Sequence, residues 1–276
     1  MTNAASGTPV SVKMLEKAVS TKASSEILAQ RHLRLMAMVV VSQMMPAGAV
    51  KGGTAMKIRM GHHTRTSLDL DVARAMDLEV FVEELQKNLR AGWNGFTGVL
   101  IAGKQAKPKD VPIGYVMSPF RVKLSYVGLS WRSVALEVGH DELGDTLETE
   151  MKMDAEIVEL FTGVGLPAPE PVAILATKHQ IAQKLHGASG DRSERAHDLV
   201  DLQLLLGGES LDLSEVKGVC IHLFRYRRLQ AWPPTVVENE NWDSLYIEAT
   251  DGIDVLPSVG EAVRWVNDLI AQIEAS

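Results

Sequence analysis

The sequence is poor in cysteine and has no long apolar segment. Cys220 is the one cysteine among 276 residues, so an internal disulfide is excluded and a zinc site of several thiolates is not expected. The longest apolar run, around residues 35–41, is far shorter than the roughly 20 residues of a membrane-spanning helix. The N-terminal residues are small and polar, so a secretory signal is not expected either. These features favour a protein of the cytoplasm that has no membrane partner.

Hydrophobic residues make up 46% of the chain, enough to bury one large core or two modest ones. Residues 1–150 alternate between helical and strand periods, whereas residues 151–276 are mostly helical in pattern. We therefore expect an α+β fold, with a mixed sheet and flanking helices in 1–150 and a mostly helical subdomain in 151–276. Within the second part, residues 242–248 are expected to form a short strand or a loop.

Charge is unevenly distributed along the chain, although the formal net charge is only -7. Residues 1–132 contain 18 Lys and Arg against 9 Asp and Glu, while residues 133–276 contain 10 against 26. A basic first half suits a polyanionic substrate, because Lys and Arg that neutralise phosphates provide affinity independent of sequence. Basic residues that merely solvate surface helices and strands would give the same counts.

The most informative stretch is Lys51–Asp71, which reads KGGTAMKIRMGHHTRTSLDLD. Gly52 and Gly53 permit backbone angles and a close approach that a side chain would block. Thr54 can offer its hydroxyl and its amide to a phosphate at the start of a short helix, where unpaired N–H groups favour an anion. This end of the stretch therefore predicts a triphosphate cradle.

The same stretch ends in two aspartates on an expected strand. Because side chains alternate along a strand, Asp69 and Asp71 should project from one face. Leu68 and Leu70 should then face the core. Mg²⁺ prefers oxygen ligands and is usually held by one or two carboxylates together with substrate phosphates, which is the chemistry of nucleotidyl transfer. The pattern predicts a site for Mg²⁺, or Mn²⁺, and a nucleoside triphosphate (NTP).

Each half of this pattern also has an ordinary structural explanation. A Gly-Gly-Thr sequence is usually only a turn, and an Asp-x-Asp strand is often solvated surface. Glu137, in the expected strand 132–138, is the best-placed candidate for a third carboxylate, because Leu136 and Val138 on either side should face the core. It would assist the metal or orient a group nearby; otherwise it is an exposed strand residue.

The order of these features resembles a known superfamily. Gly-Gly-Thr, one short helix and an Asp-x-Asp strand follow one another as in nucleotidyltransferases. The string KGGT…TRTSLDLD looks like the AbiEii and MenT nucleotidyltransferase toxins of type IV toxin–antitoxin systems. Many superfamily members have Gly-Ser where this chain has Gly53-Thr54, a change that keeps the hydroxyl. The resemblance implies a nucleotidyltransferase-like mixed sheet and a nucleotide site formed by Gly52, Gly53, Thr54, Lys51, Lys57 and Arg65.

A second block, at about residues 175–206, is expected to form an antiparallel pair of helices. Lys178 and Lys184 lie on the first helix, and Asp198 and Asp201 lie three residues apart on one face of the second. An ordinary helix pair with surface charges would explain this pattern too. AQKL followed by ERAHDLVDL nevertheless resembles the downstream motif of the AbiEii and MenT toxins. The resemblance implies that Lys184, or Lys178 in its place, contacts nucleotide phosphates, and that Asp198 or Asp201 completes the active site or holds the lysine.

By this resemblance the protein is a metal-dependent nucleotidyltransferase toxin that uses an NTP. The acceptor would be a tRNA 3′ end, the effect a block of translation, and the partner a cognate antitoxin. Three alternatives stay open from the sequence: an NTP-binding regulator without catalysis, transfer of the nucleotide to a protein hydroxyl, and a non-enzymatic acidic scaffold.

Overall fold

The computed structural model describes residues 7–104, 116–142, 144–208 and 211–276. The chain divides into two compact units. The first comprises Met1–Gly61, Thr66–Asp141 and Thr146–Ile174, and the second comprises His62–Arg65, Glu142–Asp145 and Leu175–Ser276. Two short segments that precede residue 175 thus belong to the second unit. The described residues include no helix with the length and apolar character that crossing a bilayer requires.

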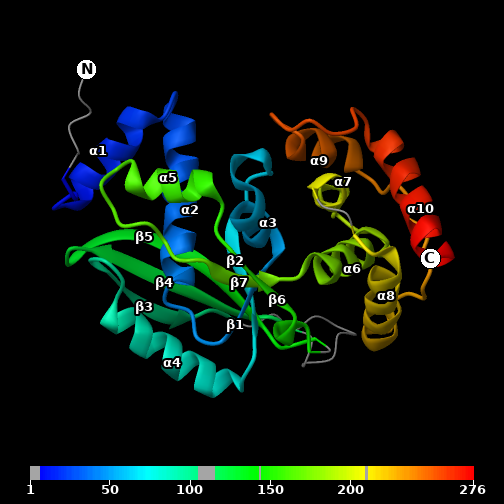
Figure 1. Ribbon diagram of the computed structural model, residues 1–276, viewed down its shortest axis with the longest axis horizontal. Coiled ribbons are helices and arrows are strands. Elements are labelled where there is room, and N and C mark those ends of the chain that lie inside the picture. The colour runs from blue at the N-terminus through cyan, green and yellow to red at the C-terminus, as the bar shows by residue number, and fades with distance from the viewer. Residues whose placement is uncertain (1–6, 105–115, 143, 209–210) are drawn as a thin grey trace. The chain divides into compact units, whose positions relative to one another are not determined.

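Seven strands form one sheet in the first unit: β1 (Gly48–Lys51), β2 (Asp69–Arg74), β3 (Phe96–Ala102), β4 (Ser118–Tyr126), β5 (Leu129–Gly139), β6 (Thr149–Lys152) and β7 (Val172–Leu175). Their order is β3-β4-β5-β2-β1-β7-β6 (Figure 1). β2 runs parallel to β5 and antiparallel to β1, while β3, β4 and β5 form an antiparallel meander. The sheet is therefore mixed, and the α+β fold expected from the sequence is confirmed.

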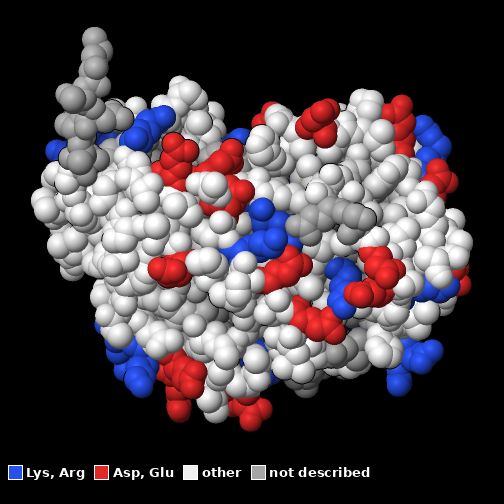
Figure 2. Space-filling model, viewed as in Figure 1, with Lys and Arg blue, Asp and Glu red and all other residues white. Residues whose placement is uncertain are grey.

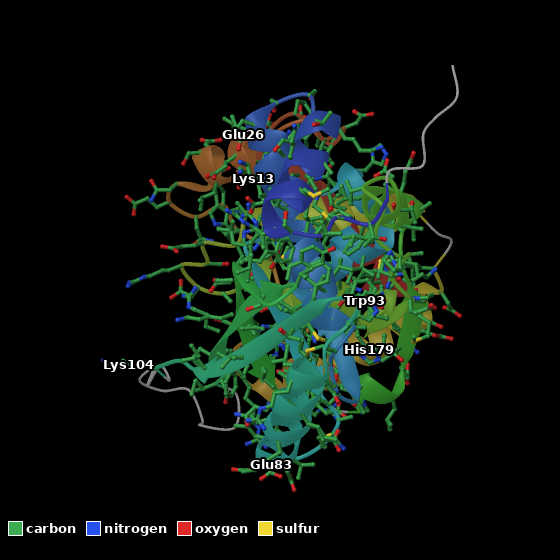
Figure 3. All side chains as sticks on the ribbon, turned by 90° about the vertical axis from the view of Figure 1, so that its left-hand side faces the viewer. Lys13, Glu26, Glu83, Trp93, Lys104 and His179 are labelled. Atoms are coloured by element: carbon green, nitrogen blue, oxygen red, sulfur yellow. The ribbon has the colours of Figure 1, made fainter. Side chains whose placement is uncertain are left out.

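The helices of the first unit are α1 (Val12–Lys22), α2 (Glu26–Ser42), α3 (Gly52–Met60), α4 (Leu78–Ala91) and α5 (Ala155–Thr162). Ser25 caps α2 by accepting a hydrogen bond from the amide of Leu28. Inward side chains of the strands share a hydrophobic core with α2, which packs on β5, and with α4, which packs on β3. In Figure 3, Glu83 marks α4 and Lys104 lies just beyond the end of β3. One face of the sheet is thus buried under helices.

The second unit is helical, with α6 (Thr177–Ala188), α7 (His197–Gly208), α8 (Leu213–Arg227), α9 (Trp242–Ala249) and α10 (Val259–Ala275). The expected pair of helices is present as α6 and α7, which pack on each other through buried residues such as Ile181 and Leu202. Polar contacts attach the segment Glu142–Asp145 to this unit. Glu142 forms an ion pair of 2.6 Å with Arg227 of α8.

Two local expectations from the sequence are wrong. Leu68 does not face the core but is 68% exposed, because β2 begins only at Asp69 and the residues before it have no ladder partner. Residues 242–249 form the helix α9 instead of a short strand or loop. Trp242 and Tyr246 are both buried, and their spacing of four places them on one helical face.

Candidate functional site

The two aspartates of the Asp-x-Asp sequence lie on the sheet face opposite α2 and α4. On β2, Leu70 is fully buried on the core side, whereas Asp69 and Asp71 are only half-buried. Asp71 lies in register with Glu137 of β5 and with Lys51 of β1. Residues directly opposite each other on neighbouring strands share a face of the sheet. Lys51, Asp71 and Glu137 form a line across three strands. Together with Asp69, these residues are called the carboxylate row.

Gly52 allows the Asp71 carboxylate to lie against the start of α3. Gly52 has φ of +65°, and a Cβ there would stand 2.1 Å from Oδ2 of Asp71. Both the backbone angle and the close approach require glycine at this position. Lys51, the N-cap of α3, makes no side-chain capping bond. The N-terminal amides of a helix favour a negative group, and the Asp71 carboxylate lies beside this start of α3.

Two hydroxyls attach to the backbone around Asp69. Thr54 is fully buried, and its hydroxyl donates to the carbonyl oxygen of Asp69 at 2.7 Å. Ser67 Oγ lies 3.2 Å from the same carbonyl and 3.4 Å from Oδ1 of Asp69. The Thr54 hydroxyl thus connects α3 to β2. Ser67 is not among the residues predicted for the site, although a hydroxyl two residues before a strand carboxylate is placed to donate to it.

A lysine side chain extends over the carboxylate row. Nζ of Lys51 lies 3.0 Å from the position where a Cβ of Gly139 would stand. Because Gly139 belongs to β5, the Lys51 side chain crosses β2 on the face that carries Asp71. Lys57, the next lysine of the stretch, is half-buried on α3. The row therefore combines carboxylates with a cation on one face.

Carboxylates of the row supply the oxygen donors that Mg²⁺ prefers. Among the described residues, no group of three or more His, Cys, Asp or Glu is placed to hold a metal ion. Magnesium in nucleotide sites is usually held by one or two carboxylates and completed by phosphate oxygens and water. Asp69 and Asp71 fit an ion of that kind by donor type and by their shared face.

The second unit contains a buried group of ionic side chains centred on Lys184. Nζ of Lys184 lies 2.5 Å from Oδ2 of Asp201 and 3.3 Å from Oδ1 of Asp198. Arg65 is 3.1 Å from Asp201, and Arg195 is 2.5 Å from Asp198. Both aspartates have no exposed side-chain surface, and Lys184 has 5%. These five residues are called the Lys184 cluster below.

Charge within the Lys184 cluster is not balanced. Burial acts to raise the pKa of Asp198, but Arg195 and Lys184 outweigh it and hold this pKa well below its usual range. Burial lowers the pKa of the adjacent His197 to about 4, although Asp198 acts to raise it. Three basic side chains therefore face two carboxylates, beside an imidazole whose pKa lies well below neutrality.

Lys178 has different surroundings from Lys184, although both belong to α6. Its Nζ pairs with Glu215 of α8 at 3.2 Å, and the two side chains are 25% and 61% exposed. Exposed pairs of this kind contribute about 0–1 kcal/mol to stability. The two candidate lysines thus differ in burial and in partner: Lys184 is fixed by α7, and Lys178 lies at the surface beside α8.

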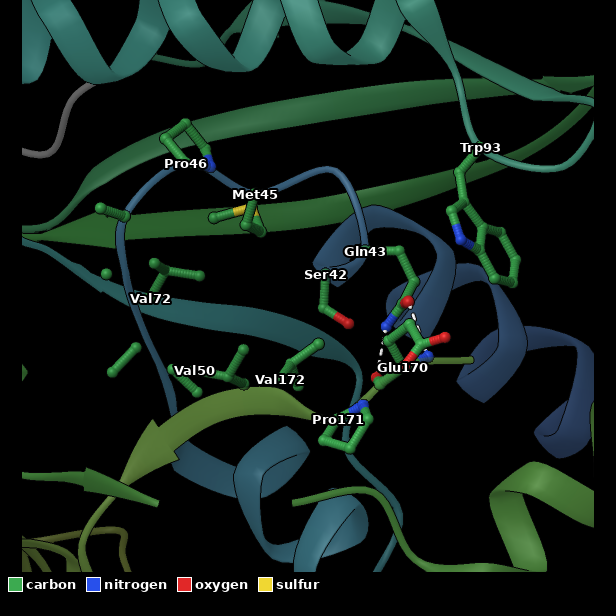
Figure 4. Close-up of a pocket in the computed structure, with 14 residues that line it drawn as sticks. Ser42, Gln43, Met45, Pro46, Val50, Val72, Trp93, Glu170, Pro171 and Val172 are labelled. Carbon is green, nitrogen blue, oxygen red and sulfur yellow. Dashed lines mark hydrogen bonds between the residues drawn. The ribbon is translucent and has the colours of Figure 1, made fainter. Parts of the chain in front are cut away.

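A pocket of about 430 Å³ lies on the helix-covered side of the sheet (Figure 4). Val50, Val72 and Val172 are among the residues that line it. Gln43 closes one side through two hydrogen bonds of 2.9 Å with the backbone of Glu170. Since Val72 follows the Asp-x-Asp pair directly on β2, its side chain points to the opposite face. The pocket is therefore separate from the carboxylate row.

On the face of the molecule shown in Figure 2, Lys and Arg lie interspersed with Asp and Glu. No broad region of one charge covers this face. The uneven distribution of charge along the sequence therefore does not produce a surface of one sign here, and charge must be considered element by element.

Comparison with known proteins gives one family and several similar structures. The family described as "Nucleotidyl transferase AbiEii toxin, Type IV TA system" matches residues 34–264. No match is found among curated proteins. The structure of MenT4, a nucleotidyltransferase toxin from Mycobacterium tuberculosis, is similar over 95% of this chain and 99% of its own, with a TM-score of 0.53 and 17% identity. This similarity shows a shared fold.

Two further structures are similar at lower TM-scores. JHP933 from Helicobacter pylori matches 92% of this chain and 97% of its own, with 16% identity and a TM-score of 0.44. An antigenic nucleotidyltransferase-like protein from Paracoccidioides brasiliensis matches 80% of this chain and 91% of its own, with 17% identity and a TM-score of 0.39.

Proposed function

Because the chain belongs to the AbiEii family of nucleotidyltransferase toxins from type IV toxin–antitoxin systems, we propose that it transfers a nucleotide from an NTP to RNA with the help of a divalent metal. Membership makes the protein a nucleotidyltransferase, with an NTP as substrate and an antitoxin as partner. The observation that carries the metal-dependent part is the carboxylate row, in which Asp71 and Glu137 are register partners and Asp69 shares their face.

In this proposal the start of α3 binds phosphates of the NTP through its first-turn amides. Asp69 and Asp71 hold the metal, which would neutralise phosphate charge near the reacting centre. Lys51 adds a cation on the same face. The acceptor hydroxyl oxygen forms a bond to the α-phosphorus, the bond from that phosphorus to the bridging oxygen breaks, and pyrophosphate leaves. The hydroxyl proton passes to a carboxylate of the row, for which Glu137 is the candidate.

The proposed acceptor is the 3′ end of a tRNA, and the proposed consequence is a block of translation that the cognate antitoxin relieves. A nucleotide on the terminal hydroxyl would prevent attachment of an amino acid there. Transfer to a protein hydroxyl is the second candidate, because the chemistry at the NTP would be identical. A protein that binds an NTP and does not transfer it is the third.

Lys184 and Lys178 remain the two candidates for a cation that contacts the NTP phosphates. The resemblance of its AQKL helix to the downstream motif of the toxin family supports Lys184. Lys184→Met should then lower transfer more than Lys178→Met, since only the former removes a cation of the cluster. The opposite ranking would assign the role to Lys178. Thermal denaturation of both variants separates loss of activity from loss of folding.

The direct test incubates the protein with each radiolabelled NTP and with total RNA or total protein. Wild type should label RNA only when Mg²⁺ or Mn²⁺ is present. Asp69→Asn should lower labelling by on the order of 100-fold or more, since a misplaced reacting group can already cost that much. The matched control is Asp77→Asn, which changes an exposed carboxylate that makes no capping bond to α4.

Full labelling by Asp69→Asn would refute the proposed metal site. Label in protein instead of RNA would select the second candidate. Mg²⁺-dependent binding of NTP in a calorimeter, with no label in either fraction, would select the third.

A further inference from the structure

The meander β3-β4-β5 exposes one face that no described helix covers. On β3, Val99 is 62% exposed and Ile101 is 40% exposed, while the alternate residues Phe96 and Gly98 are buried against the core. On β4, the exposed positions alternate with buried ones in the same way. Val99 and Ile101 thus present two exposed β-branched aliphatic side chains on the same face of β3.

Two cations share this face. Arg121 and Lys123 are exposed on β4, and they lie in register with Ile101 and Val99 of β3, respectively. Neither cation has an ion-pair or hydrogen-bond partner among the described residues. Glu137 is the one acidic residue in the three strands. The open face is therefore cationic and aliphatic, and its acidic end belongs to the carboxylate row.

Register connects the two cations to the carboxylate row. Arg121 lies opposite Ala135 of β5, and Ala135 lies opposite Asp69 of β2. With neighbouring strands about 4.8 Å apart, the backbone of Arg121 stands roughly 10 Å from that of Asp69. Lys123 lies two residues further along β4, roughly 7 Å away from Arg121. A chain that leaves the carboxylates along this face would meet both cations within its first few units.

We propose that the open face of β3-β4-β5 docks the acceptor RNA, with Arg121 and Lys123 on its phosphates and with Val99 and Ile101 on its sugars and bases. The inference rests on the proposed nucleotidyl transfer and adds the surface that binds the acceptor. Charge complementarity identifies the occupant, because two exposed cations that make no ion pair with any described residue suit a polyanion. Sheet faces bind single-stranded RNA in this manner, and contacts to backbone and base faces tolerate many sequences.

The expected size of the effect follows from the release of counterions. Each phosphate contact with a single strand contributes about 0.7 to the slope of log affinity against log salt. Arg121→Ala with Lys123→Ala should therefore reduce the slope by about 1.4. At about 0.15 M salt the same relation gives a loss of affinity of roughly 15-fold. Because both side chains are exposed, the variant should unfold at the wild-type temperature.

The experiment measures anisotropy of fluorescent bulk tRNA and of a fluorescent single-stranded RNA between about 50 and 200 mM salt. The matched control removes two exposed cations from α4, on the opposite face, through Lys87→Ala with Arg90→Ala. The control should keep the wild-type slope. A third variant, Val99→Thr with Ile101→Thr, retains β-branched side chains and should weaken binding without changing the slope.

Labelling assays separate this inference from the proposed function. The Arg121 and Lys123 variant should bind NTP as wild type does and should label RNA with a raised KM for RNA.

Wild type that binds RNA with the predicted slope but labels none would refute nucleotidyl transfer to RNA and leave the docking face supported. Wild-type affinity, slope and KM in the variant would overturn the docking face. The face would then be assigned to a protein, such as the antitoxin or a second copy of the chain.

Discussion

Replacing Asp201 by leucine is expected to destabilise the protein more than any other single change in the Lys184 cluster. Asp201 has no exposed surface, and it binds Lys184 and Arg65, which are 5% and 18% exposed. Asp201→Leu removes the carboxylate that Arg65 and Lys184 share, and leaves Lys184 with Asp198 at 3.3 Å. Breaking a buried ion pair from one side costs about 3–5 kcal/mol. For a chain of this size, that loss lowers the melting temperature by on the order of 10 °C.

Two matched variants should cost less. Asp198→Leu releases Arg195, whose side chain is already 51% exposed and can turn into water. Lys184→Met leaves each carboxylate with its own arginine. Both variants should therefore lose about 1–3 kcal/mol. The double variant Lys184→Met with Asp201→Leu removes both members of the 2.5 Å pair together and should be more stable than Asp201→Leu alone.

Thermal and urea denaturation, followed by circular dichroism, give the melting temperature and the free energy of unfolding of all four variants. Equal melting temperatures for Asp201→Leu and Asp198→Leu would refute the argument from partner burial. A double variant no more stable than Asp201→Leu would show that the lost partner of Lys184 does not account for the destabilisation by the single change.

Three further predictions concern other parts of the chain. Gly52→Ala should displace the Asp71 carboxylate and lower nucleotide transfer by on the order of 100-fold. The control Gly218→Ala lies on α8, where a Cβ meets open space. It should raise the free energy of unfolding by about 0.5–1 kcal/mol. Burial lowers the pKa of His186 from 6.5 to about 4, so as pH falls through this range the unfolded chain binds a proton that the folded chain does not. Stability to urea should then fall by up to about 1.4 kcal/mol per pH unit, and His186→Gln should remove that part of the slope. Burial raises the pKa of Cys220 to about 12, so iodoacetamide should label this thiol only in denaturant, as mass spectrometry would show.

Local periodicity explains which parts of the site were predictable from the sequence. The period of two in a strand places Asp69 and Asp71 on one face, whatever surrounds them. A spacing of three in a helix does the same for Asp198 and Asp201. The resemblance to the toxin family then supplied the enzyme class, which the family match confirms. The roles of the individual site residues stay predictions.

Long-range contacts explain what the sequence did not reveal. The pairing of Glu137 with Asp71 depends on the register of β5 against β2, which tertiary packing sets. The hydroxyl of Thr54 was expected to face a phosphate, yet packing of α3 on β2 directs it to a carbonyl. β6 and β7 have four residues each, and runs this short cannot be told from other structure by period.

Segments of the two units alternate along the chain, so parts of the second unit are synthesised at different times. Arg65 pairs with Asp201, which follows 136 residues later. At about 5–20 residues per second, a ribosome makes that partner roughly 7–27 s after Arg65. During this interval the nascent chain already contains the Asp-x-Asp strand, but the second unit has not been completed. The second unit, and with it the Arg65–Asp201 pair, is therefore completed only after the last helices have been translated.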